Sequence, residues 1–188
     1  MSILSHKTRN KMAGFTLIEV MATLLLLGLV TALTVQRFMP ADSFSTESAG
    51  SLTASLGSIQ GAYNAYVNDK NGQPAFGTGN NALGDSSFVP AYLFIPRPPG
   101  GFDSEYGSSG FVLGQRSGLA TPDNGVYICA KAARVTATST PFRGILKAAA
   151  TMSATKFFYN DNCPATTSLV RDPTVATDVY VTSWIVRN

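Results

Sequence analysis

The sequence predicts an α+β protein in which one long N-terminal helix, membrane-spanning over its first half, packs on an antiparallel β-sheet. Three observations support this fold class. Residues 15–35 are almost entirely apolar, and the segment after them has the spacing of a helix with one apolar face. The rest of the chain alternates short apolar runs with stretches rich in Gly, Pro, Ser and Asn, which is typical of strands joined by loops. At 188 residues, the chain suits one modest domain in addition to this helix.

The apolar run from Phe15 to Val35 has the length of a membrane-spanning helix. Its only charge is Glu19, and because a helix rises about 1.5 Å per residue, the run can span the roughly 30 Å hydrocarbon core of a bilayer. Lys7, Arg9 and Lys11 precede it. Positive residues stay on the cytoplasmic side, so the N-terminus is predicted to be cytoplasmic and the rest exported. The residues after the run make a poor signal-peptidase site, so we expect the helix to be retained.

A second stretch of helix is predicted at about residues 44–69. Pro40 lacks the N–H that a helix interior needs, so it should kink or interrupt the helix before that stretch. Apolar residues then recur at gaps of three and four and form one stripe: Leu52, Leu56, Ile59, Tyr63 and Tyr66. The segment also contains glycines that lower helix propensity but permit close approach of neighbouring elements: Gly50, Gly57 and Gly61. The turn residues at 68–72 should end the helix.

The remainder is predicted to form the sheet and one short helix. The strand candidates are bounded by turn residues: Phe88–Ile95, Gly125–Lys131, Thr155–Asn160 and Asp178–Arg187. The short helix is expected at Pro141–Met152. A long loop is expected at residues 72–87; its glycines lack the Lys and Ser or Thr that complete a phosphate-binding loop.

The only two cysteines, Cys129 and Cys163, fall in the exported part. An oxidising compartment favours pairing over free thiols, so we predict a structural disulfide. It would close a loop of about 35 residues and contribute roughly 3–4 kcal/mol in the chain-entropy model.

The charge of the chain gives little support for a nucleic-acid partner. The formal net charge is +3, but three of the 14 basic residues lie before the apolar run, and the other 11 balance 11 acids. The strongest alternative is a strip for single-stranded nucleic acid made of basic residues with interleaved tyrosines: Arg97, Arg116, Lys131, Arg134, Arg143, Lys147 and Lys156 with Tyr92, Tyr106 and Tyr127. An ordinary mixed surface is the favoured interpretation.

Patterns for catalysis or metal binding are weak. The only histidine, His6, precedes the apolar run, which excludes a histidine-based triad or metal site from the exported part. Asp103 with Glu105, and Asp161 beside Cys163, are the remaining candidates for a carboxylate pair or calcium ligands. Their sparse spacing in loops favours solvated charges. We therefore predict no enzyme activity, no cofactor and no metal.

The most specific motif is KMAGFTLIEV at residues 11–20. A basic leader ends at Gly14, and the hydrophobic Phe15 and the sequence TLIE open the apolar run. In these features the sequence resembles the type IV prepilins and the related pseudopilins of type II secretion. The resemblance implies that prepilin peptidase cuts between Gly14 and Phe15 and that the Phe15 amine is methylated. It also implies a cleaved leader at 1–14, a transmembrane and assembly half of the spine helix at 15–37, and an exported pilin head at 38–188.

The same resemblance gives Glu19 a role. Cleavage creates a positive amine at Phe15 inside the membrane, where an ionised carboxylate is costly unless it has a partner. In the family, this glutamate is thought to pair with the amine of a neighbouring subunit. Pairing within its own helix, or an unpaired interfacial carboxylate on a simple anchor, are the alternatives. Gly28 lies where pilin helices often loosen on assembly, and close helix packing would also explain it.

By resemblance, the expected function is that of a structural pilin subunit. It would be held in the bacterial inner membrane with its N-terminus inside, then polymerise through its apolar helix into an extracellular type IV pilus, with the help of an assembly platform in that membrane. Adhesion, twitching motility and DNA uptake are left open. The alternatives are a minor pilin, a pseudopilin of type II secretion, and, from a different class, a signal-anchored exported binding module.

Overall fold

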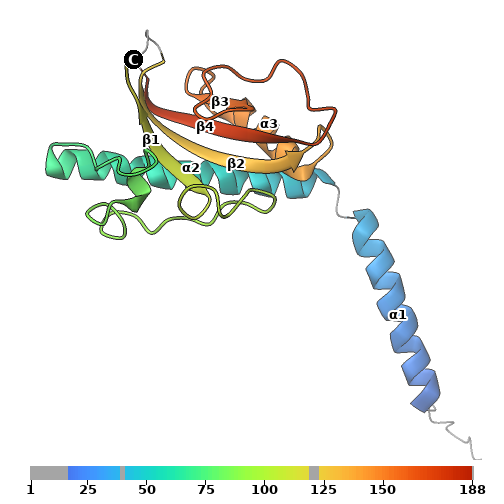
Figure 1. Cartoon of the computed structure of the whole chain (residues 1–188). Helices are drawn as coiled ribbons and strands as arrows, with labels where there is room; N and C mark the ends of the chain where they lie inside the picture. Colours follow the sequence, from blue (N-terminus) through green and yellow to red (C-terminus); the bar gives the residue numbers. More distant parts are fainter. Residues whose placement is uncertain (1–16, 39–40, 119–122, 188) are drawn as a thin grey trace, which may run out of the picture. The chain divides into compact units, whose positions relative to one another are not determined.

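The computed structural model describes residues 17–38, 41–118 and 123–187, with side chains at 17–27 and from 44 onwards within these ranges. The chain divides into two compact units, residues 1–40 and 41–188, which are described separately. The class is α+β, with helices and a four-stranded antiparallel sheet (Figure 1). The predicted fold class is therefore confirmed.

Helix α1 (Leu17–Phe38) is the described element of the first unit. Its sequence is rich in leucine and other residues of high helix propensity. It is described to Phe38, and the next helix from Ala41. Pro40, where an interruption is predicted, lies outside the described residues. Within the described ranges, no helix is both long and apolar enough to cross a membrane. The membrane-spanning role expected of residues 15–37 therefore stays a prediction.

Helix α2 (Ala41–Lys70) opens the second unit. The whole predicted stripe is buried: Leu52, Leu56, Ile59, Tyr63 and Tyr66. The helix ends as expected at the turn residues, where Asn71 takes the left-handed conformation with φ of 51°. The three glycines differ from the prediction, because they lie on the exposed face of the helix. No atom of a neighbouring described element comes within 4 Å of a Cβ built at any of them.

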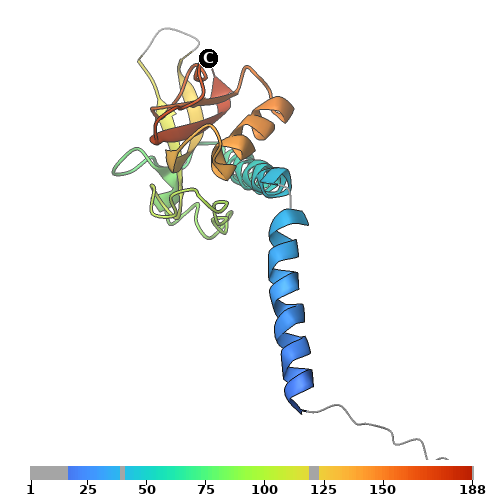
Figure 2. The ribbon, with the colours of Figure 1, turned by 90° about the vertical axis from the view of Figure 1, so that its right-hand side faces the viewer.

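Four strands form the sheet in the order β1–β2–β4–β3. Their bounds, with that of the intervening helix, are β1 Phe111–Arg116, β2 Gly125–Val135, α3 Thr140–Thr151, β3 Phe157–Asn160 and β4 Thr177–Arg187. The last three predicted strands and the predicted short helix are thus confirmed, with small shifts of their ends. Figure 2 shows α2 and α3 on the same side of the sheet.

The strand predicted at Phe88–Ile95 is wrong. Its first part, to Tyr92, forms turns, in which the Tyr92 N–H donates to the Phe88 carbonyl at 2.9 Å, and its last three residues are irregular. Pro90 has no N–H to donate to a strand partner. Phe88 and Leu93 are nevertheless buried, because they enter the core from a loop. Their burial explains why the apolar pattern is like that of a strand.

The first strand of the sheet is instead β1, which was not predicted. It contains Gly114, whose missing side chain leaves room for an aromatic ring of the adjacent strand. A Cβ at this position would lie 2.4 Å from Cζ of Tyr127. Glycine has a low β propensity and therefore weakens the sequence pattern of a strand. At this position, however, the Tyr127 ring leaves no room for a larger residue.

The larger core lies between one face of the sheet and the two α-helices α2 and α3. It includes Leu52 and Leu56 of α2, Ile145 of α3, and Leu113 and Ile128 of the sheet. These side chains are fully or almost fully buried.

A smaller core covers the other face of the sheet. On β2, Tyr127 and Cys129 belong to it, while the residues that alternate with them belong to the larger core. The loop after β3 closes it: the Ala165 N–H donates to the Thr182 hydroxyl at 2.8 Å, and the Trp184 indole donates to the Ala165 carbonyl at 3.0 Å. Both faces of the sheet are therefore covered.

The free edge of β1 is closed by side chains. The side-chain oxygen of Asn80 accepts from the Gln115 N–H at 3.1 Å, and its side-chain nitrogen donates to the Gln115 carbonyl at 2.6 Å. The Asn81 side chain accepts from the Leu113 N–H at 3.0 Å. Because these backbone groups are already paired, this edge cannot take up a further strand by hydrogen bonding at those positions.

The edge strand at the other side, β3, is protected in a similar way. The Leu169 N–H donates to the Tyr159 carbonyl at 2.8 Å, and the Asn160 side chain donates to the Thr167 carbonyl at 3.1 Å. Residues 167–169 thus lie along β3.

Candidate assembly segment

The predicted processing and assembly residues belong to α1 and the residues before it. Gly14 and Phe15, the predicted cleavage and methylation positions, lie outside the described residues. Glu19 lies in the first turn of α1. The partial positive charge of a helix N-terminus stabilises a carboxylate in this position.

Apart from Glu19 and Thr23, the described side chains of α1 are apolar. Every residue from Leu17 to Leu27 is exposed, and Leu17 and Leu25 are 79% and 73% exposed. The hydroxyl in this stretch, that of Thr23, donates to the Val20 carbonyl at 2.9 Å, so its polar group is satisfied within the helix. A helix that is hydrophobic all round is buried in a bilayer or among other helices. The segment thus has the surface of an element that packs into an apolar environment.

The carboxylates considered as a calcium or acid–base site are not brought together as a site, and Asp103 has other partners. One Asp103 oxygen accepts from the Glu105 N–H at 3.0 Å, and the other lies 3.7 Å from the Lys131 ammonium. Asp161 is exposed in the loop after β3. In the described part of the chain, no three His, Cys, Asp or Glu side chains come together in a group that could hold a metal ion.

Three residues of the considered basic and aromatic strip, Lys131, Tyr106 and Tyr127, have partners within the fold. The Asp178 carboxylate lies 3.0 Å from the Lys131 ammonium and raises the pKa of that group. Tyr106 packs edge-on against Tyr180, and burial raises the pKa of Tyr106 to about 12. Tyr127 is buried in the smaller core. Tyrosines held in this way do not offer free faces on which bases can stack.

The disulfide joins Cys129 and Cys163, with an S–S distance of 2.07 Å. Cys129 is fully buried on β2, and Cys163 lies in the loop that follows β3. The bond therefore ties this loop to the sheet face that the smaller core covers.

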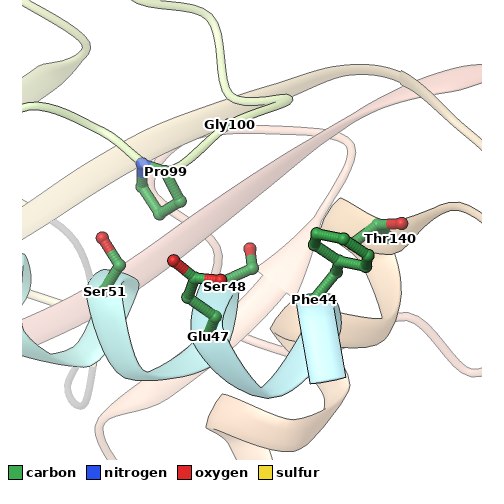
Figure 3. A pocket seen from close by; sticks show the side chains of 7 residues that line it. All are labelled: Phe44, Glu47, Ser48, Ser51, Pro99, Gly100 and Thr140. Atoms are coloured by element: carbon green, nitrogen blue, oxygen red, sulfur yellow. The ribbon is translucent and has the colours of Figure 1, made fainter. Parts of the chain in front are cut away.

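Sequence patterns gave no sign of a groove beside the first turns of α2 (Figure 3). Its lining includes Phe44, Glu47 and Ser51 of α2, Pro99 of a loop and Thr140 of α3. These residues come from three segments that are far apart in the chain. No local spacing marks such a site, so only the tertiary structure identifies it.

Comparison with known proteins identifies the N-terminal segment. Residues 9–35 match the model of the prokaryotic N-terminal methylation motif. The match includes Gly14, Phe15 and Glu19 and extends through most of α1. Comparisons with curated proteins and with solved structures found no match. The chain therefore carries the N-terminal methylation motif of a type IV pilin or prepilin-type protein.

Proposed function

We propose that the protein is a structural subunit that polymerises through its N-terminal helix into a type IV pilus. The observation that carries the proposal is the methylation motif at residues 9–35 together with the apolar, exposed surface of α1 that begins within it. Before assembly, this helix anchors the subunit in the inner membrane. In the filament, the same surface packs against the helices of other subunits.

Processing by prepilin peptidase prepares the helix for this role. Cleavage between Gly14 and Phe15 removes the basic leader and leaves a positive amine, which is then methylated. The Glu19 carboxylate of a neighbouring subunit neutralises this amine in the apolar bundle. Pairing matters there because an isolated charge in a water-free interior is strongly destabilising.

The closed edges of the sheet support assembly through helices. The Gln115 and Leu113 backbone groups on β1 already have side-chain partners, and residues 167–169 lie along β3. Strand addition between subunits, the main alternative for building a fibre from a sheet protein, would have to displace these contacts first.

The proposal is tested by mass spectrometry of the protein in membranes and in sheared surface filaments. The mature chain should begin at Phe15 and carry one N-methyl group, and it should be present in the filaments. The variant Gly14→Val, which places a bulky branched residue before the cut, should leave the precursor in the membrane. A mature chain that still begins at Phe15 in this variant would contradict the processing step. Processed protein that never enters surface filaments, with loss of secreted enzymes on deletion, would instead indicate a pseudopilin.

A further inference from the structure

The groove beside the first turns of α2 has two adjacent lobes within the second unit. One lobe has a volume of about 360 Å³ and the other about 510 Å³. Ser51, Pro99 and Gly100 line both lobes, so the lobes meet at these residues. Figure 3 shows Phe44, Glu47, Ser48 and Ser51 on α2, facing the loop that carries Pro99 and Gly100.

The loop wall of the groove is fixed by close packing. Gly101 has a φ of 88°, and a Cβ there would lie 2.2 Å from Cγ of Pro141. Gly110 has a φ of 93°, and a Cβ there would lie 2.4 Å from Cγ of Pro98. The Asp103 N–H also donates to the Lys131 carbonyl at 2.7 Å. The groove is therefore held in shape without a ligand, as binding sites commonly are.

The lining combines an aromatic ring, hydroxyl groups and two opposite charges. Phe44 is 48% exposed and contributes its ring to the first lobe. Glu47 lines the same lobe and Arg97 the other, and neither takes part in the ion pairs found among the described residues. The hydroxyl residues of the two lobes are Ser48, Ser51, Thr140 and Ser104.

Ser48 adds a hydrogen-bonding group without a partner. Its hydroxyl oxygen is buried against α3, and within the described part of the chain it has no hydrogen-bond partner. Rotation about its Cα–Cβ bond moves the hydroxyl away from α3. A hydroxyl on a ligand in the groove can then both donate to this group and accept from it.

We propose that this groove binds a neutral, polyhydroxylated ligand of the size of one or two pyranose rings. The apolar C–H face of the sugar ring covers the Phe44 ring, while its hydroxyls bond to Glu47, Ser51 and Thr140. The Glu47 carboxylate disfavours an anion in the first lobe, and Arg97 disfavours a cation in the second. An ammonium group on a ligand could pair with the Glu47 carboxylate, but it cannot accept a hydrogen bond from a serine hydroxyl.

The test uses the full-length protein in dodecylphosphocholine, a detergent without sugar. Saturation-transfer NMR titrations measure binding of methyl α-glucoside, methyl α-mannoside, methyl β-galactoside and N-acetylglucosamine, and of the dipeptide lysyl-glutamate as a charged competitor. At least one sugar should bind, and the dipeptide should not displace it. Phe44→Ala and Glu47→Gln should each weaken that binding by about tenfold, as expected for loss of a ring contact or of a charged hydrogen bond.

Two variants outside the groove are matched controls. Phe94→Ala removes a ring that is 85% exposed, and Glu105→Gln neutralises an exposed acid. Both should bind sugar like the wild type. Binding of none of the four sugars, preferential binding of the dipeptide, or equal binding by the groove and control variants would each overturn the proposal. Because Phe44 is half exposed, its loss should leave the fold intact, which thermal unfolding monitored by circular dichroism checks.

Discussion

At the scale of single residues, Arg187 joins several parts of the fold, a role that no sequence pattern indicated. Its guanidinium lies 4.5 Å from the centre of the Phe158 ring and donates to the Thr155 carbonyl at 3.0 Å. It also donates to the Thr166 carbonyl at 3.2 Å and lies 3.2 Å from the Asp123 carboxylate. One side chain thus links the end of β4 to the residues before β3 and to the loop after it.

We predict that Arg187→Leu lowers the free energy of unfolding by about 2–3 kcal/mol, because several hydrogen bonds and a cation–π contact are lost together. Urea unfolding followed by circular dichroism measures this loss. Arg171→Leu, at an exposed position in the loop after β3, is the matched control and should change the stability by less than about 0.5 kcal/mol. Equal stability of the two variants would show that these contacts contribute little.

Asp178 should make the stability depend on pH. The Arg134 N–H, which donates to this carboxylate at 2.9 Å, and the Lys131 ammonium hold its pKa below the ordinary value of 3.8. The folded state therefore gains stability from the carboxylate above pH 3.8, and loses it as the pH falls through the lowered pKa. In Asp178→Asn, unfolding free energies measured by urea titration should be lower at neutral pH and should decrease less on acidification. Asp161→Asn should follow the wild-type profile, and an identical profile for Asp178→Asn would refute this account.

At the scale of elements, the closed edge of β1 is expected to depend on Asn80. This residue has a φ of 54°, which asparagine tolerates better than alanine. Asn80→Gly keeps the backbone relaxed but leaves the Gln115 N–H and carbonyl without their side-chain partner. We predict a loss of about 1–2 kcal/mol in unfolding free energy and faster aggregation, because an open edge can pair with another chain.

Urea unfolding and light scattering measure the two effects. Asn80→Ala should lose slightly more stability than Asn80→Gly, since it adds backbone strain. Asn162→Gly, in the exposed loop after β3, is the control and should aggregate no faster than the wild type. If Asn80→Gly behaves like this control, then water can replace the asparagine and the edge needs no side-chain protection.

Strong periodicity explains which elements could be predicted from the sequence. The stripe from Leu52 to Tyr66 has helical spacing, and the β-branched and aromatic residues of β4 mark a strand, so both were found. The segment from Phe88 to Ile95 has an apolar pattern for a different reason, since its residues reach the core from turns. β1 was missed because Gly114 makes way for the Tyr127 ring. Tertiary packing, which local spacing does not contain, decided both cases.

At the scale of the whole molecule, the disulfide is one of several bonds that hold the loop after β3. Ala165 is bonded to Thr182 and Trp184 independently of Cys163. We predict that the double variant Cys129→Ala, Cys163→Ala loses about 2–4 kcal/mol of unfolding free energy but keeps its fold. The only tryptophan, Trp184, is buried and reports on this region.

The fluorescence of this tryptophan should stay blue-shifted in the double variant before unfolding in urea. An emission maximum typical of exposed indole in the absence of denaturant would show that the disulfide alone keeps the loop in place. Wild-type protein with its disulfide intact gives the reference for both emission and stability.

The candidate sites differ in how far the sequence reveals them. The processing motif is continuous in the chain, since the basic leader, Gly14, Phe15 and Glu19 follow one another closely. The disulfide could be inferred because only one pair of cysteines exists. The groove beside α2 unites Phe44, Pro99 and Thr140 only after folding. The burial of Tyr127 and the packing of Tyr106 against Tyr180 likewise follow from the tertiary structure and not from local spacing.

The central claim, that α1 is the assembly element and that Glu19 pairs with the Phe15 amine of a neighbouring subunit, is tested most directly by Glu19→Ala. Removal of the Glu19 carboxylate makes the apolar segment more apolar, so membrane insertion should be unchanged. Loss of one partner of a buried pair typically costs about 3–5 kcal/mol, so entry into filaments should fall sharply. Glu105→Ala, which removes an exposed acid of the second unit, is the control.

The measurement is the ratio of protein in sheared filaments to protein in membranes, for the wild type and both variants. We predict a ratio at least about tenfold lower for Glu19→Ala and a wild-type ratio for Glu105→Ala, with equal amounts of Glu19→Ala and wild-type protein in the total membrane extract before assembly. An equal ratio for Glu19→Ala and the wild type would contradict the pairing between subunits.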